Sequence, residues 1–135
     1  MTKEEKSTLI KYRLERADES LRAAQLMLEN KLYIPAMNRI YYSMFYAVLA
    51  LLVLSESAFS KHGQVKGFFN REFIKTGVFV KDFGKLFNTV FEYRQKFDYV
   101  DLITPEEELI SDYIDEAKRF IDEISKYLDA KLALL

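Results

Sequence analysis

The segment Pro35–Leu54, with the sequence PAMNRIYYSMFYAVLALLVL, decides the fold of this chain. Proline is favoured in the first turn of a helix, and the residues that follow are apolar on nearly every side of a helical projection. Such a helix lies at the centre of a bundle, where other helices cover it. Its uncharged part, Ile40 to Leu54, is short for a membrane span and is bracketed by Arg39 and Glu56. We therefore predict a buried central helix.

Two longer amphipathic helices are predicted near the ends of the chain. The first covers about Lys3 to Glu29, and we expect Asn30 to end it in the left-handed conformation. The last begins at Thr104, Pro105 and Glu107, which have the pattern of an N-cap, a first-turn proline and a capping-box acid. Apolar residues recur in steps of four and three in both helices: Ile10, Leu14, Ala17, Leu21, Ala24 and Leu28 in the first, and Ile110, Ile114, Ala117, Ile121, Ile124 and Leu128 in the last. The matching stripes predict that these helices pack as antiparallel neighbours.

Two further helices are predicted between the central helix and the last one. One runs from His62 to Lys75 and ends at Gly77. The other runs from Lys81 to Tyr99, with a core stripe at Phe83, Phe87, Val90, Arg94 and Phe97. The fold class predicted from these patterns is all-α, an antiparallel up-and-down bundle of four or five helices. Residues 1–135 are expected to form a single domain.

Composition excludes several classes of function. Twenty basic and 21 acidic residues leave a net charge of −1, so no global positive field attracts nucleic acid, and such binding would need a local patch. The chain has no cysteine and one histidine, which excludes disulfides and thiolate chemistry and disfavours a zinc site. We expect no metal and no cofactor. The charged N-terminus has no signal peptide pattern, so we expect a cytoplasmic protein and no membrane contact.

Five polar residues occupy positions that are predicted to face the interior. Arg39, Tyr42 and Tyr46 share one face of the central helix, and Arg94 interrupts a core stripe with Asp98 one turn later. Buried guanidinium groups need anionic partners. These partners are either internal, with Arg94 paired to a nearby aspartate and Arg39 to an acid elsewhere, or they belong to a bound phosphate. Alternatively, the arginines extend to solvent.

His62 lies where a connection enters the third predicted helix. A single histidine in such a place is commonly a cap or a surface residue. In the first turn, however, the helix dipole favours the neutral imidazole, which is the form suited to base chemistry. We therefore keep His62 as a candidate for the site.

The sequence resembles the HEPN domain, the small helical domain of prokaryotic nucleotidyltransferase-associated proteins. The resemblance runs over most of the chain and is most specific in the combination of its motifs. These are AAQLMLEN at 23–30, NRIYYSMFYA at 38–47, KHGQV at 61–65, FNREFIKTG at 69–77 and YRQKFDY at 93–99.

The resemblance implies a five-helix bundle that forms a homodimer and works beside a nucleotidyltransferase partner in a toxin–antitoxin pair. Many members of the family resemble metal-independent ribonucleases, in which an arginine is followed after four to six residues by a histidine. Arg39 matches that arginine, but the residue after six intervening positions is Tyr46. A tyrosine with an ordinary pKa near 10 is a poor base at neutral pH, although it can hold a phosphate by a hydrogen bond.

Three functions remain open from the sequence. The first is a non-catalytic dimeric module that binds a nucleotide or RNA phosphate through Arg39, Tyr42, Arg94 and Asp98. The second is a metal-independent endoribonuclease that uses Arg39 with His62 or Tyr46. The third is a purely structural helical dimer in which the arginines form core ion pairs.

Overall fold

The structure is a computed structural model that describes residues 1–57 and 61–135. All regular secondary structure in those residues is helical: α1 (Lys3–Glu29), α2 (Tyr33–Leu54), α3 (His62–Phe69), the π-helical turn η1 (Asn70–Ile74), α4 (Lys81–Tyr99) and α5 (Glu107–Ala133). The predicted all-α fold is therefore confirmed.

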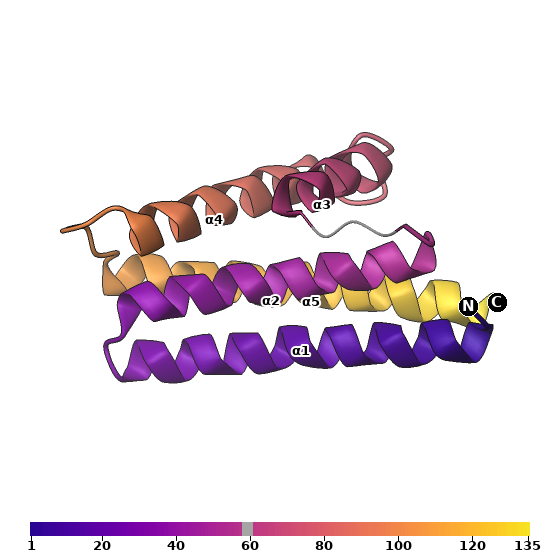
Figure 1. Cartoon of the computed structure of the whole chain (residues 1–135), viewed down its shortest axis with the longest axis horizontal. Coiled ribbons are helices and arrows are strands. Elements are labelled where there is room, and N and C mark those ends of the chain that lie inside the picture. Colours follow the sequence, from indigo (N-terminus) through magenta and orange to yellow (C-terminus); the bar gives the residue numbers. More distant parts are fainter. Residues whose placement is uncertain (58–60) are drawn as a thin grey trace.

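Helix α2 lies in the middle of the bundle, as predicted (Figure 1). It forms an antiparallel hairpin with α1 and also packs against α4 and α5. Helices α1 and α5 are antiparallel neighbours, which confirms the pairing expected from their matching stripes. The start of α1 lies beside the end of α5, where Lys3 Nζ donates a hydrogen bond of 2.7 Å to the main-chain oxygen of Leu135.

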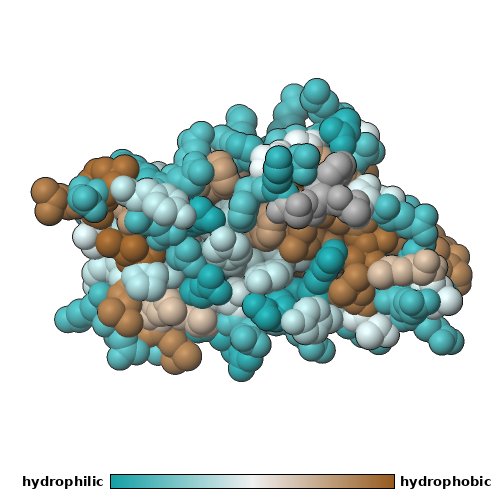
Figure 2. Space-filling view, viewed as in Figure 1, coloured by the Kyte–Doolittle hydropathy of each residue, from teal (hydrophilic) through white to brown (hydrophobic). Residues whose placement is uncertain are grey.

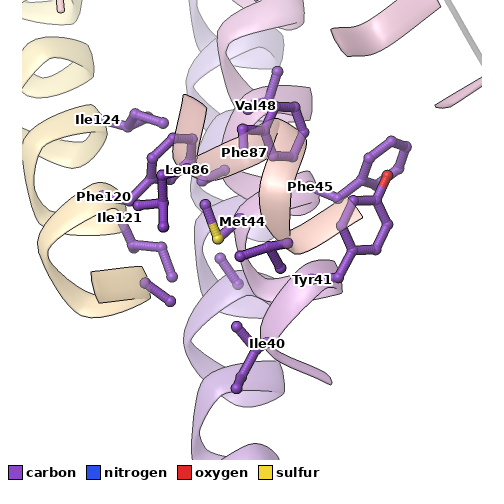
Figure 3. Close-up of a cluster of buried hydrophobic side chains, with 14 of the residues drawn as sticks. Ile40, Tyr41, Met44, Phe45, Val48, Leu86, Phe87, Phe120, Ile121 and Ile124 are labelled. Carbon is purple, nitrogen blue, oxygen red and sulfur yellow. The ribbon is translucent and has the colours of Figure 1, made fainter. Parts of the chain in front are cut away.

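The core is built on one side of α2 (Figure 3). Ile40, Met44 and Val48 are fully buried there, in the same cluster as Phe87 of α4 and Phe120 of α5. The rings of Phe87 and Phe120 lie 5.8 Å apart, within the range of favourable aromatic pairs. Helix α2 is long and apolar enough to cross a membrane, but 67% of its most apolar window is buried inside the bundle. That degree of burial is consistent with the core helix of a soluble protein.

The predicted core stripes agree closely with the burial of individual residues. Every stripe residue of α4 and α5 is buried, including Arg94. In α1, Leu14 and Leu28 are only half-buried, while the other stripe residues are buried. The spacing of apolar residues therefore identified the inward side of all three helices.

The turn between α1 and α2 differs from the prediction in one detail. Asn30 is the C-cap of α1, but its φ of −99° is not left-handed, and its side-chain amide donates to the carbonyl oxygen of Leu26 at 2.8 Å. Lys31, with φ 60°, takes the left-handed conformation instead. Helix α2 then begins at Tyr33 and has Pro35 in its first turn, two residues earlier than predicted.

The third predicted helix is not a continuous α-helix. It is α-helical only to Phe69, and the five residues Asn70–Ile74 form the wider turn η1. The amide of Lys75 donates to the carbonyl of Asn70 at 2.9 Å, a bond that spans five residues instead of four. The predicted end at Gly77 is confirmed, since its φ of 79° is left-handed.

Close packing against α4 accompanies the wide turn. Gly84 of α4 lies so near η1 that an added Cβ would be 2.8 Å from Oδ1 of Asn70. The turn directs Phe73 into the core, where its ring is 5.6 Å from that of Phe68 and 6.1 Å from that of Phe69. The sequence pattern did not reveal this change of winding, because the apolar residues on both sides of it are still close to helical spacing.

The start of α5 was predicted two residues too early. Thr104 is not its N-cap, and Glu106 holds that position without a side-chain capping bond. The first helical main-chain bond joins the amide of Ile110 to the carbonyl of Glu106 at 3.2 Å. Pro105 is buried before the helix begins, so the chain packs against the bundle at a point where the pattern predicted a first helical turn.

Candidate functional site

One side of α2 carries a row of polar side chains between α1 and α4. Asn38, Arg39, Tyr42 and Tyr46 form this polar face of α2, and all four are half-buried. The prediction that Arg39 and the two tyrosines share a face is correct, but they do not point into a closed interior. Figure 2 views the bundle with α2 between α1 and α4. Hydrophilic and pale side chains cross the middle of this view, and hydrophobic groups gather towards both ends.

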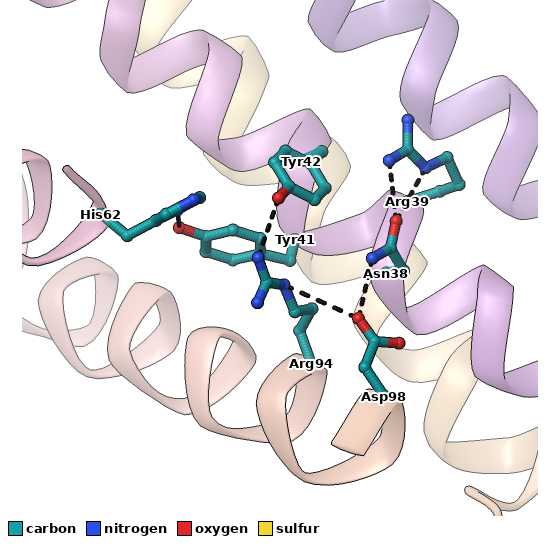
Figure 4. Close-up of polar contacts among 7 residues, drawn as sticks. All are labelled: Asn38, Arg39, Tyr41, Tyr42, His62, Arg94 and Asp98. Atoms are coloured by element: carbon teal, nitrogen blue, oxygen red, sulfur yellow. Dashed lines mark hydrogen bonds and ion pairs between the residues drawn. The ribbon is translucent and has the colours of Figure 1, made fainter. Parts of the chain in front are cut away.

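Arg94 of α4 reaches the polar face from the opposite helix (Figure 4). It is 7% exposed, and its Nη2 donates a hydrogen bond of 2.8 Å to the hydroxyl of Tyr42. The guanidinium also lies over the rings of Tyr41 and Tyr42, with Cζ 5.2 Å and 5.3 Å from the two centroids. Such cation–π contacts are strengthened when the cation is withdrawn from water.

The predicted ion pair between Arg94 and Asp98 is present but loose. Nε of Arg94 and Oδ2 of Asp98 are 3.8 Å apart, too far for a hydrogen bond. Nε is therefore a buried donor without a hydrogen-bond partner among the described residues. Asp98 instead accepts a bond of 2.9 Å from Nδ2 of Asn38.

Arg39 has no acidic partner in the described parts of the chain. Its Nε and Nη2 donate to Oδ1 of Asn38 at 3.1 Å and 2.7 Å, and its Cζ lies 5.0 Å from the ring centroid of Tyr42. The expected acid elsewhere in the fold is not found, because no carboxylate of the described residues lies within 4.0 Å of this guanidinium. Arg39 is thus a half-exposed cation that is held only by a neutral amide and a ring.

Two arginines of α1 complete this side of the molecule, and sequence reasoning missed both. Nη2 of Arg16 donates to the hydroxyl of Tyr46 at 3.0 Å, and Nη1 of Arg13 donates to the carbonyl of Leu49 at 2.7 Å. They lie three residues apart beside the apolar stripe of α1. That spacing could have indicated basic side chains directed at the neighbouring helix.

His62 is the first residue of α3 and meets Tyr41 of α2. Its Nδ1 lies 2.6 Å from the Tyr41 hydroxyl, and its ring is 4.6 Å from that of Phe45. Burial, assisted by the nearby charge of Arg94, lowers the pKa of His62. The predicted neutral form is therefore supported, although burial and not the helix dipole is its main cause.

The protonation of Tyr41 determines which nitrogen of His62 is free. Burial raises the pKa of Tyr41, so its phenol keeps its proton. Among the described residues His62 is the one hydrogen-bond partner of that hydroxyl, and a buried donor without a partner is costly. We therefore assign the proton of this bond to Tyr41, which leaves neutral His62 with its own proton on Nε2. In that tautomer His62 can donate a hydrogen bond but has no free lone pair to act as a base.

The candidate catalytic residues do not form one compact group. In Figure 4, His62 and Arg39 lie on opposite sides of the Tyr41–Tyr42 pair. The hydroxyl of Tyr46 contacts Arg16 of α1. The proposed phosphate ligands, in contrast, are linked, because Tyr42 contacts both Arg39 and Arg94.

The charged groups on this side are mostly cationic. The contacts on this side involve the guanidinium groups of Arg13, Arg16, Arg39 and Arg94 and the carboxylate of Asp98, and Glu19 lies near Arg16. Guanidinium groups bind phosphate oxygens through paired N–H donors. Within the described residues, no group of three or more potential metal ligands is present.

The sequence of this chain is similar to a family of helical domains and to individual proteins. A family model for the HEPN domain matches residues 10–127. A UPF0332 protein of Thermotoga maritima is 46% identical over 125 residues, which cover 93% of this chain and 95% of that protein. Two proteins of Methanocaldococcus jannaschii that are named as candidate toxins are each 36% identical, over 118 and 115 residues. The first match covers 87% of this chain and 80% of that protein, and the second covers 85% of each.

Proposed function

We propose that this chain, which belongs to the HEPN domain family, binds the phosphate of a nucleotide or RNA on the polar face of α2. In this proposal it acts as a homodimer in the cytoplasm, beside a nucleotidyltransferase, in a toxin–antitoxin pair. The candidate toxins among its relatives support the biological setting. The main support for this binding site is the half-exposed guanidinium of Arg39, which has no carboxylate partner among the described residues. Arg39 and Arg94 also both contact Tyr42.

The hydrogen bonds that Arg39 makes leave some of its N–H groups available to an anion that binds and dissociates. Asn38 holds one edge of the guanidinium, and its own amide is oriented by Asp98. A phosphate that bound the remaining N–H groups would neutralise a charge that no acid neutralises in the described structure. The unbonded Nε of Arg94 supplies a further donor next to the same tyrosine.

Isothermal calorimetry with adenosine 5′-monophosphate tests this site. Wild-type protein should give a saturable heat, and Arg39→Ala should weaken binding about tenfold or more, since hydrogen bonds to charged groups contribute about 1.5–3 kcal/mol. Arg22→Ala is the matched control, because Arg22 is an exposed arginine of α1 that makes no contact with the polar face. Equal heats for wild type and Arg39→Ala, or no heat at all, would count against the site.

We infer that the domain does not itself cleave RNA. Tyr46 occupies the position of the histidine in the family motif, and its hydroxyl accepts a hydrogen bond from Arg16. His62 lies apart from Arg39 and uses its Nδ1 lone pair for Tyr41. Neither residue is therefore placed to take a proton from a ribose that is bound at Arg39.

The alternative function is a metal-independent endoribonuclease, and the archaeal relatives named as candidate toxins are compatible with it. Purified protein, Arg39→Ala and His62→Ala should be incubated with mixed cellular RNA in EDTA. We expect no cleavage above background from any of them. Cleavage that yields cyclic phosphate ends and is lost in Arg39→Ala would replace our proposal, and the His62 variant would then identify the base.

The proposed assembly is tested separately from the site. Light scattering coupled to gel filtration should give twice the chain mass for the wild-type protein, and a co-expressed nucleotidyltransferase should elute with it. A monomer at micromolar concentration would contradict the homodimer. A dimer that binds neither nucleotide nor RNA would favour a purely structural role.

A further inference from the structure

Arg16 and Tyr46 form a second guanidinium–tyrosine pair, one turn along α2 from the pair formed by Arg39 and Tyr42. Nη2 of Arg16 donates to the Tyr46 hydroxyl at 3.0 Å, and its Cζ lies 4.9 Å from the Tyr46 ring centroid. The Arg39 guanidinium lies at nearly the same distance, 5.0 Å, from the ring of Tyr42. The two arginines come from different helices, α1 and α2, yet they reach neighbouring positions on one face.

The spacing of the two pairs is set by the helix. Four residues separate Tyr42 from Tyr46, which corresponds to about 6 Å along the helix axis. Their ring centroids are 6.4 Å apart. This separation is comparable to that between neighbouring nucleotides of a single strand, whose bases and phosphates follow such aromatic and basic grooves.

Arg16 resembles Arg39 in forming no ion pair, although the carboxylate of Glu19 lies near enough to attract its charge. Both are half-buried, and in the described chain no carboxylate lies within 4.0 Å of either guanidinium. The other contact of Arg16 is a long one, 3.4 Å from Nη1 to the hydroxyl of Tyr12, whose side chain is 54% exposed. Arg13 differs, because its guanidinium donates to the Leu49 carbonyl and thereby joins α1 to α2.

We propose that Arg16 and Tyr46 are a second phosphate subsite, so that the polar face of α2 binds a single-stranded oligonucleotide through two neighbouring phosphates. The inference rests on the proposed phosphate site at Arg39. A mononucleotide can occupy only one of the two pairs, whereas a strand that lies along α2 occupies both. The exposed ring of Tyr12 then lies beside the second phosphate, where a base can stack on it.

The test is fluorescence anisotropy with labelled single-stranded uridine oligonucleotides of two, four and eight residues, with uridine 5′-monophosphate and uridine triphosphate as competitors. The proteins are wild type, Arg39→Ala, Arg16→Ala, Arg16→Lys, Tyr46→Phe and the control Arg22→Ala. Thermal melting checks that each variant is folded. Each affinity is measured at several salt concentrations.

Arg39→Ala should weaken every ligand. Arg16→Ala should weaken the four- and eight-residue oligonucleotides about tenfold, since it removes one charged contact that only the longer ligands make. It should leave the monophosphate and the two-residue oligonucleotide unchanged, because the latter has a single internucleotide phosphate. For the longer oligonucleotides its salt dependence should fall by about 0.7 in the slope of log K against log salt, as expected for one phosphate contact on a single strand. Arg16→Lys should fall between wild type and Arg16→Ala. Tyr46→Phe removes the hydroxyl that holds the Arg16 guanidinium and should weaken the longer oligonucleotides less than Arg16→Ala does. Arg22→Ala should bind like the wild type.

Other results overturn the inference in distinguishable ways. If Arg39→Ala weakens binding and Arg16→Ala does not, the phosphate site stands and the second subsite is wrong. Equal losses for the monophosphate and the oligonucleotides in Arg16→Ala would mean that Arg16 only supports the first site. A further possible result is that uridine triphosphate competes as strongly as the eight-residue strand, with an affinity that Arg16→Ala lowers. That result would indicate that the ligand is a polyphosphate and not a strand. Binding that neither arginine affects would contradict both proposals.

Discussion

The two sides of helix α2 differ in what holds their side chains in place. On one side Ile40, Met44 and Val48 are fully buried by neighbouring helices. On the other side Arg39 and Tyr42 are half-buried. Arg39 is held by two hydrogen bonds to Asn38 and by the ring of Tyr42, whose hydroxyl accepts one hydrogen bond from Arg94. The comparison shows that an apolar composition identifies a central helix but does not reveal that one side of it remains accessible. Substitutions on the first side should therefore change stability, and those on the second should change binding.

The largest effect is expected on the buried side. Ile40→Ala removes a fully buried side chain and should lower the free energy of unfolding by about 2–5 kcal/mol, through lost burial and the cavity that it leaves. Urea denaturation followed by circular dichroism measures this. The neighbouring substitution Arg39→Ala is the matched control. A similar loss in both variants would remove the distinction between the two sides.

Arg94 lies between the two sides and should give the next largest effect. Arg94→Ala leaves Asp98 and the Tyr42 hydroxyl without their cation, and we expect a loss of about 3 kcal/mol by the same measurement, near the low end for a broken buried pair because the contact is 3.8 Å long. Arg94→Met combined with Asp98→Leu removes both charges together and should be less destabilised than Arg94→Ala. If the double variant is the less stable of the two, the charged pair contributes a net stabilisation that we do not expect.

A smaller, pH-dependent effect is expected from His62. Its pKa is lowered in the folded protein by burial and by Arg94, so on acidification the unfolded chain takes up this proton first. Stability contributed by neutral His62 is thus complete above the unfolded pKa of about 6.5 and falls as the pH drops towards the lower folded value.

His62→Gln isolates that contribution. The free energies of unfolding of wild type and variant should be compared from pH 7.5 to pH 5.5, where the wild type should lose more stability than the variant. Carboxylates titrate at lower pH and affect both proteins equally. Parallel curves would show that His62 is not held in its neutral form.

The smallest effect on stability is expected on the polar face itself. Arg39→Ala should change the free energy of unfolding by no more than about 0.5 kcal/mol, since its side chain is half-exposed and forms no ion pair within the described residues. The melting temperature should change little while nucleotide affinity is lost. A large fall in melting temperature would indicate that Arg39 supports the fold and would weaken the binding proposal.

The fold was largely predictable because it depends on spacing within single helices. The stripe of α5 from Ile110 to Leu128 and the unusual core position of Arg94 both follow from the helical period, and both are buried as expected. Helix ends were less predictable. Thr104 had the favoured residue type for an N-cap, but the packing of Pro105 delays the helix to Glu107.

The candidate site was only partly predictable because its contacts join different helices. Arg39 and Tyr42 could be placed together from their spacing on α2. The approach of Arg16 to Tyr46 depends on how α1 packs against α2. The hydrogen bond between His62 and Tyr41 depends on where α3 lies after the connection that follows α2. The spacing of Arg13 and Arg16 could have indicated that they face a neighbouring helix, but the spacing within one helix does not identify the partner in either contact.

The wide turn η1 allows its segment to hold one residue more than an α-helix would. That residue lies within Asn70–Ile74. A chain that lost one residue from this segment could close ordinary α-helical hydrogen bonds. Since the five residues of the wide turn fill the place of about four α-helical residues, the deletion would keep Phe73 near Phe68 and Phe69. Single-residue deletions at the exposed positions Arg71 and Glu72 should therefore be tolerated better than deletions within the regular helix α4.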